Sequence, residues 1–196
     1  MYHKNVLLVT QKKHTDIFLV LVPHRDVRLV LRNYSVSLFR AGVSGAFCFP
    51  WSAPLAAVSR ALDDAELKNC ARVLRKALGS KISASQPRTC AFGNEALFGP
   101  RIEINSLPDV LKDAAGKVTE IFPQPVIGAC LLSASETESA ILPPPPELSF
   151  SAAAVSNLYL RRTDEGGALN VRWKIGKLCW LPPSRKSEKI FRDYHG

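Results

Sequence analysis

The feature that most constrains the fold is a strand–helix–strand order that occurs twice along the chain. In residues 17–55, the apolar run Ile17–Val22 precedes a helical pattern over Arg25–Arg40 and a further strand-like stretch. In residues 101–132 a short strand and a helix precede the apolar run Val126–Leu132, which has the pattern of a central strand. Sequence identity between the copies is low, so only the order of elements repeats. This repetition predicts two similar lobes.

Periodic apolar residues predict three helices. The helix over 25–40 presents a basic side to water, formed by Arg25, Arg28 and Arg32. Its buried stripe would be Val27, Leu31, Tyr34 and Leu38. In the second copy, Ser106 would cap a helix whose stripe is Leu107, Leu111, Ala114 and Val118.

The remaining helix has both of its ends marked. Asp63 and Glu66 form a capping-box pattern, and Gly79 ends the helix. The buried residues would be Leu67, Ala71, Leu74 and Leu78, and the residues facing water would be Lys68, Arg72, Arg75 and Lys76.

Other segments connect these elements or follow them. Residues 83–98 are polar and contain glycine, which predicts a loop or a weak strand. Four consecutive prolines, 143–146, predict a stiff spacer. Residues 154–162 and 170–181 then flank a charged, glycine-containing turn and predict a β-hairpin. We therefore expect one bilobal domain over residues 1–181 and a basic tail over residues 182–196.

Composition places the chain among cytoplasmic globular proteins. It has 196 residues, of which 46% are hydrophobic and 22% are charged. Its apolar stretches are far shorter than the roughly 20 residues of a membrane helix, and no signal-peptide cleavage pattern follows the N-terminus. The five cysteines form no CxxC pair, which predicts reduced, packed thiols and no zinc site. No membrane partner is expected.

The charge of the chain is compatible with a polyanionic partner. Lysine and arginine number 26 against 17 acidic residues, a formal net charge of +9. The excess is strong near the C-terminus, where residues 151–196 contain nine Lys and Arg against four Asp and Glu, a local +5. RNA or a nucleotide is the partner that this pattern suggests.

Catalytic and cofactor motifs are absent from the sequence. It has no glycine-rich phosphate loop, no nucleophile elbow and no zinc-protease motif, so no cofactor or metal is expected. The four histidines are His3, His14, His24 and His195. Two are close to the ends of the chain, and the other two fit solvated or capping roles better than catalysis.

The order of elements resembles the 2H phosphoesterases, the superfamily of RNA 2′,3′-cyclic phosphodiesterases and 2′-5′ RNA ligases. The resemblance extends in layout over roughly residues 17–181 and is strongest at two segments. One is FLVLVPHRDVRLVLRNYSVSLFRAG and the other is NLYLRRTDEGGALNVRWKIGKLCWLP. It implies an α+β, bilobal 2H-phosphoesterase-like fold, in which two antiparallel sheets flanked by helices face a central cleft.

The catalytic motifs of that superfamily are missing. Each lobe of a 2H phosphoesterase carries a His-x-Thr/Ser motif on a central strand. Here Ser52 and Pro54 stand at those positions in the first lobe, and Gly128 and Cys130 in the second. No histidine occurs from residue 25 to residue 194, so the loss does not depend on the alignment. Without two imidazoles, the family's general acid–base mechanism should not operate.

The resemblance therefore implies a non-catalytic protein that binds RNA or nucleotide phosphates in a basic cleft. Trp51 could stack a base beside this cleft. The cleft would be lined by Ser52, Ser59, Arg60, Arg161, Arg162, Arg172 and Lys174. Two alternatives stay open. One is an active phosphodiesterase or ligase with relocated groups, for which His14 and His24 are the candidates. The other is a structural or protein-interaction scaffold whose cleft is filled by large side chains.

Overall fold

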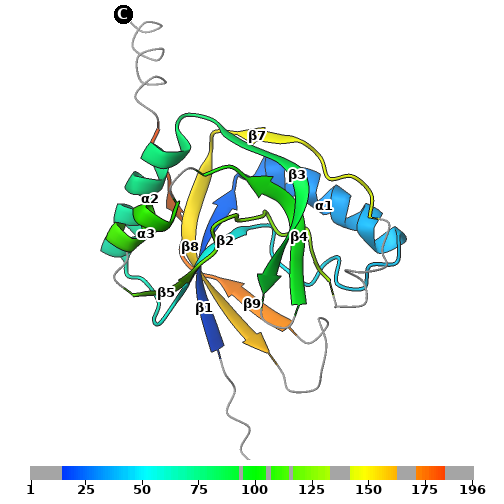
Figure 1. Cartoon of the computed structure of the whole chain (residues 1–196), viewed down its shortest axis with the longest axis horizontal. Helices are drawn as coiled ribbons and strands as arrows, with labels where there is room; N and C mark the ends of the chain where they lie inside the picture. Colours follow the sequence, from blue (N-terminus) through cyan, green and yellow to red (C-terminus); the bar gives the residue numbers. More distant parts are fainter. Residues whose placement is uncertain are drawn as a thin grey trace, which may run out of the picture.

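The fold consists of two antiparallel sheets (Figure 1). The computed structural model describes residues 15–92, 95–104, 107–114, 117–132, 142–162 and 171–183. The first sheet, sheet A, has the order β10-β8-β1-β2-β5, with β9 also paired to β8. Its strands are β1 (Thr15–Pro23), β2 (Ala53–Val58), β5 (Val118–Ile121), β8 (Ala153–Arg162), β9 (Val171–Ile175) and β10 (Cys179–Trp180).

Sheet B is smaller and has the order β6-β4-β3-β7. Its strands are β3 (Ile82–Phe92), β4 (Glu95–Ile102), β6 (Cys130–Leu132) and β7 (Leu148–Phe150). The two sheets and their flanking helices confirm the α+β class and the expectation of two antiparallel sheets.

Helices cover the outer side of both sheets (Figure 1). On sheet A, α2 (Asp64–Leu78) and α3 (Leu107–Ala114) pack beside each other. On sheet B, α1 (Arg25–Arg40) buries Tyr34 and Leu38 in a cluster with Phe98. Of the stripe expected for α1, Leu31, Tyr34 and Leu38 are buried and Val27 is half-buried.

Phenylalanines fill the space between the two sheets. Phe18 of β1, Phe92 of β3 and Phe122 belong to one buried cluster, and the rings of Phe18 and Phe92 are 4.8 Å apart. Phe49, which is 1% exposed, meets Phe92 edge-on at 5.2 Å. Because these rings come from both sheets, the sheets pack directly against each other over this region.

The two strand–helix–strand copies are interwoven in space. In the first copy β1 and β2 pair with each other, while α1 packs against the other sheet. In the second copy β4 belongs to sheet B and β5 to sheet A. Sheet A therefore takes strands from both copies, whereas sheet B takes strands from the second copy but none from the first.

The local signals of α2 are confirmed. The Asp63 side chain accepts from the backbone N–H of Ala65 and of Glu66, both at 2.9 Å, and Glu66 accepts from the N–H of Asp63. The four apolar stripe residues are buried. Arg75 is different: it was expected in water but is only 9% exposed. Its guanidinium donates to the carbonyl oxygens of Pro182, Gly79 and Ser151 at 2.7–2.9 Å, which replaces the lost water.

Three other expectations about strands and helices differ from the structure. Of the two alternatives for residues 83–98, a loop or a weak strand, the structure shows strand: these residues form most of the long β3–β4 hairpin. The helix expected to reach Val118 ends at Ala114, and Val118 begins β5. The run Val126–Leu132 was expected as a central strand, but only 130–132 form β6, at the edge of sheet B.

Several expectations concern residues that the structure does not describe, among them the turn after β8 and the tail from residue 184 on. None of the helices in the described segments is long and apolar enough to cross a membrane.

Candidate functional site

The β8–β9 hairpin places three of the expected phosphate-binding side chains on one face. Arg161 pairs with Arg172 across the two strands, and Tyr159 pairs with Lys174. Residues that oppose each other in antiparallel strands share a face, and so do residues two apart on one strand. Arg161, Arg172, Lys174 and Tyr159 therefore lie together. The alternation of β8 puts Leu158 and Leu160 on the other face, in the cluster between the sheets.

These four residues line a pocket of about 590 Å³. The other lining residues are Thr15, Trp173, Ile175, Gly176 and Lys177. Arg161, Arg172 and Lys174 are exposed, whereas Tyr159 is half-buried. Gly176 lies beside this ring: a β-carbon built on it would be 3.5 Å from Tyr159, an ordinary contact distance.

Three cations of this pocket have no acidic partner in the part of the chain that the structure describes. Within the described residues, no carboxylate lies within ion-pair distance of Arg161, Arg172 or Lys174. Lys177 is different, since it pairs with Asp64 at the start of α2, and this contact raises the pKa of Lys177. Two like charges directly opposite each other in a sheet are destabilising. An anion between Arg161 and Arg172 would relieve that repulsion.

Arg162, the fourth expected cation of the hairpin, belongs to β8, but its side chain lies outside the described part of the structure. Trp173 pairs with Leu160, so the two are on the same face of the sheet, opposite the face that carries Tyr159. The side chain of Trp173 is 43% exposed.

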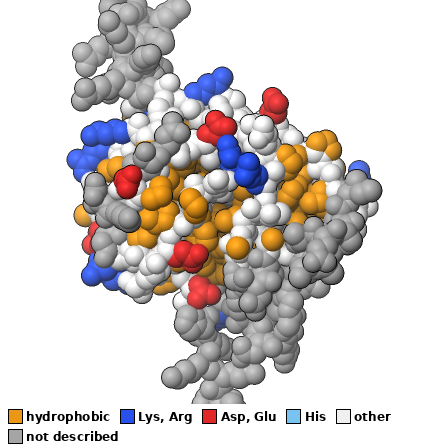
Figure 2. Space-filling model, viewed as in Figure 1, with side chains coloured by type: hydrophobic (Ala, Val, Ile, Leu, Met, Phe, Trp, Pro, Cys, Tyr) orange, Lys and Arg blue, Asp and Glu red, His pale blue; other side chains and the backbone are white. Residues whose placement is uncertain are grey.

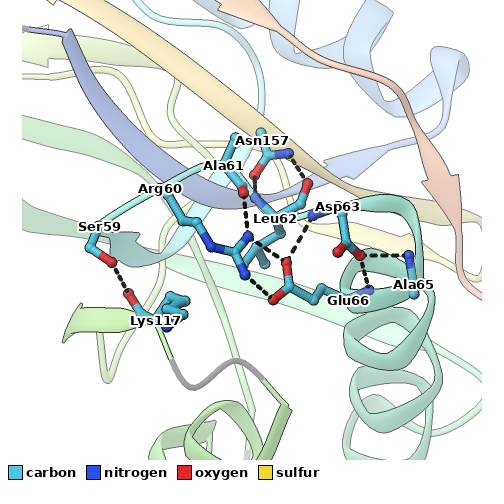
Figure 3. Close-up of polar contacts among 9 residues, drawn as sticks. All are labelled: Ser59, Arg60, Ala61, Leu62, Asp63, Ala65, Glu66, Lys117 and Asn157. Atoms are coloured by element: carbon cyan, nitrogen blue, oxygen red, sulfur yellow. Dashed lines mark hydrogen bonds and ion pairs between the residues drawn. The ribbon is translucent and has the colours of Figure 1, made fainter.

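Arg60 stabilises the start of α2 instead of lining the basic pocket (Figure 3). Its guanidinium forms a two-point ion pair with Glu66, with N···O distances of 2.8 and 2.6 Å, and also donates to the Ala61 carbonyl. This pairing lowers the pKa of Glu66 and raises that of Arg60. Three of the five N–H donors of this guanidinium are therefore used within the protein, and its charge is paired with a carboxylate.

Ser59 lies in a second pocket, of about 600 Å³, at an open end of the space between the sheets. The floor of this pocket includes Phe18, Phe92 and Phe122, and its lining includes the carboxylates Asp16 and Glu120. Figure 2, in the same view as Figure 1, shows apolar side chains near the centre of this face with both acidic and basic side chains around them. Two carboxylates in the lining disfavour phosphate in this second pocket. Because Ser59 lines this pocket while Arg161, Arg172 and Lys174 line the other, the residues expected to bind phosphate do not form a single inter-sheet cleft.

Trp51 is part of the packing between α1 and the strands. Its Nε1 donates to the Ser35 hydroxyl at 3.0 Å, and that hydroxyl donates to the Ala129 carbonyl, also at 3.0 Å. The indole is half-buried against the cluster that includes Leu31. These contacts link three segments far apart in the sequence, and Trp51 lines neither of the two pockets described above.

The four substituted motif positions are buried, and one position of each lobe contacts the other. The backbone N–H of Gly128 donates to the Ser52 carbonyl at 2.9 Å, which brings the two expected motif sites together. Ser52 is 0% exposed, and Pro54 and Cys130 are also buried. A β-carbon on Gly128 would lie 2.5 Å from Phe49 and 2.7 Å from Leu97. This packing leaves no room for a side chain at Gly128, and none of the four residues reaches either pocket.

His24 is the one histidine within the described residues. It precedes α1, and its Nδ1 lies 3.2 Å from the Asp26 carboxylate. Its ring is 6.0 Å from that of Trp180. The basic pocket begins at Thr15, at the other end of β1, and nine residues of extended strand separate the two by about 30 Å. His24 therefore cannot reach a phosphate bound at Arg161.

Sequence reasoning missed two residues of this region. Tyr159 was not singled out, although its spacing from Arg161 on one strand places both on the same face. Asn157 positions the segment before α2: its side chain accepts from the Leu62 N–H at 2.9 Å and donates to the Leu62 carbonyl at 2.8 Å (Figure 3). No sequence pattern announces such a long-range contact.

Known proteins add no constraint on this site. In the described residues, no group of three or more His, Cys, Asp or Glu could hold a metal ion. Comparison with protein-family models and with curated proteins finds no match for this chain.

Proposed function

We propose that this chain binds RNA or nucleotide phosphates, without catalysis, through the basic pocket of the β8–β9 hairpin. The observation that carries the proposal is the cross-strand pair Arg161–Arg172, which has Lys174 beside it and no carboxylate partner among the described residues. Such a group of cations supplies the charge that a phosphodiester backbone needs. The half-buried ring of Tyr159 offers a surface on which one base can stack.

We further propose that the fold is a degenerate 2H-phosphoesterase-like fold, in a protein of the cytoplasm. Two antiparallel sheets with their helices outside support this relationship, as does the contact between the substituted positions Ser52 and Gly128. The phosphate-binding pocket would then lie away from the inter-sheet space, which phenylalanine side chains fill.

Two alternatives rest on specific observations. The phenylalanine-filled space between the sheets favours a scaffold that binds no small ligand. The contact between His24 and Asp26 favours a relocated acid–base group, because a carboxylate can orient an imidazole. For the enzyme alternative, phosphodiester cleavage or ligation should vanish in His24→Ala.

The test uses a short fluorescent RNA that ends in a 2′,3′-cyclic phosphate, titrated with the protein at two salt concentrations. Fluorescence anisotropy measures binding, and a gel of the same samples shows the state of the terminus. Salt-sensitive binding with an intact cyclic end is the expected result. A converted end would refute the non-catalytic assignment, and absence of binding at low salt would refute RNA binding and favour the scaffold.

A further inference from the structure

Exposed large hydrophobic side chains are concentrated on α1 and in the loop that follows it. Of the six such side chains among the described residues, three lie on α1 and one in that loop: Leu29, Val30, Phe39 and Phe47. Phe39 is 59% exposed, and its ring lies 5.9 Å from that of Phe47. The helix was expected to present only a solvated basic surface on its solvent-facing side, so the apolar residues need another explanation.

Two of these exposed residues, Leu29 and Phe39, lie near three arginines of the helix. Leu29, the half-buried Val36 and Phe39 are seven and three residues apart, and Arg25, Arg32 and Arg40 lie three or four residues from Leu29 or Val36. Such spacings place all six on one helix face, which we call the α1 seam. Within the described residues, no carboxylate is within ion-pair distance of these arginines, and Asp26 of the same helix contacts His24.

We propose that the α1 seam docks an acidic amphipathic helix of a protein partner. The arginines recur at intervals of seven and eight residues, or two helical turns, which is about 11 Å along the axis. A partner helix with carboxylates at seven-residue spacing and leucine-like residues between them matches both the charge and the apolar pattern. This inference does not depend on the phosphate-binding pocket, which lies in a different part of the fold.

Other occupants fit the α1 seam less well. In a symmetric pair of seams from two copies of this chain, Arg32 would face its own counterpart, and like charges would repel. A lipid surface needs a broad apolar face, but the broad apolar side of α1 is buried against sheet B. RNA would leave the aliphatic Leu29 and Val36 without a partner, because only flat side chains stack on bases.

The test measures anisotropy of a fluorescein-labelled synthetic helix that carries leucine and glutamate at the stated spacings. A second peptide has lysine in place of each glutamate. With the full chain, we expect the glutamate peptide to bind and the lysine peptide not to bind. Arg32→Glu, at an exposed position, should weaken glutamate-peptide binding about tenfold and create binding of the lysine peptide. Arg72→Glu, an equal charge change on the exposed side of α2, should leave both unchanged.

Several results would overturn the proposal. One is that the glutamate peptide does not bind at millimolar concentration. Another is that Arg32→Glu and Arg72→Glu weaken its binding equally. Binding of anionic phosphatidylserine vesicles that Arg32→Glu abolishes would assign the seam to a membrane instead. Self-association in sedimentation velocity that the same variant abolishes would assign it to a second copy.

Discussion

Replacing Arg172 by glutamine should weaken RNA binding while leaving the fold slightly more stable. In the folded chain Arg172 lies directly opposite Arg161, with Lys174 on the same face. Within the described residues neither arginine has a carboxylate partner, and a bound anion would relieve their repulsion. The substitution removes one phosphate contact and the repulsion at the same time.

The magnitudes follow from the number of cations. For single strands the slope of log K against log salt is about −0.7 per neutralised phosphate, so three cations give about −2.1 and two give about −1.4. A fourfold rise in salt should therefore weaken binding about 18-fold in the natural chain and about 7-fold in the variant. At low salt, loss of one charge-assisted contact should weaken binding about tenfold. Because both arginines are exposed, the gain in stability should not exceed about 0.5 kcal/mol in 0.1 M salt.

Fluorescence anisotropy of a labelled single-stranded RNA, titrated with protein at salt concentrations from about 50 to about 200 mM, measures the slope of log K against log salt. Urea unfolding followed by tryptophan fluorescence measures stability. Lys76→Gln is the matched control, because Lys76 is an exposed cation on α2, distant from the pocket in the fold. The reasoning is refuted if the two variants have the same salt slope and affinity, or if Arg172→Gln lowers the free energy of unfolding by more than the control does.

Three further outcomes test the packing around the site. Asn157→Leu leaves the buried N–H and C=O of Leu62 without partners and should cost about 2–4 kcal/mol in urea unfolding, whereas Ser59→Ala should cost under about 0.5 kcal/mol. Gly128→Ala forces its new methyl group against Phe49 and should lower stability by about 1–3 kcal/mol, so an unchanged unfolding midpoint would contradict the packing at this position. Glu66 has a lowered pKa, chiefly through the hydrogen bond from its guanidinium partner. Its contribution is therefore present above the unfolded pKa of about 4.3 and is lost as pH falls through the folded pKa. Unfolding measured from pH 6 to pH 3 should accordingly be less steeply pH-dependent in Glu66→Gln than in the natural chain.

The elements that could be predicted are those whose signals are local. The ends of α2 follow from Asp63, Glu66 and Gly79, because capping involves residues only a few positions apart. The pairing of β8 with β9 likewise follows from two alternating runs close together in the sequence. Such contacts form in the same way whatever the rest of the chain does.

The β3–β4 hairpin escaped prediction because its alternation is interrupted. The register shifts between Ser85 and Pro87, and Gln86 between them adopts a positive φ of 55°. A bulge of this kind breaks the period-two pattern by which a strand is identified. Residues 126–132 were predicted as a strand for the opposite reason, because their apolar pattern is uninterrupted. They are apolar because α1, β4 and the phenylalanine cluster surround them, and burial on all sides gives the pattern of a central strand.

The candidate site divides in the same way. Arg161, Arg172 and Lys174 come together because hairpin register is local, so their common face follows from the sequence. The roles of Arg60 and Trp51 depend on partners chosen by the fold, Glu66 for one and Ser35 for the other. Arg75 was misplaced for the same reason, since the three carbonyl groups that receive its hydrogen bonds lie in separate segments.

The distance between the basic pocket and His24 separates phosphate binding from acid–base catalysis by this histidine. General acid–base catalysis needs a titrating group within hydrogen-bond distance, or one water, of the reacting oxygen. A phosphate held at Arg161 is about 30 Å from His24, so the contact between His24 and Asp26 cannot serve it. No histidine is among the described residues that line the pocket. A relocated histidine base would therefore have to come from outside the described residues, and His14, one residue before Thr15, is the histidine nearest to the pocket in the sequence. A phosphodiester converted by the natural chain and by His24→Ala, but not by His14→Ala, would separate that case from simple binding.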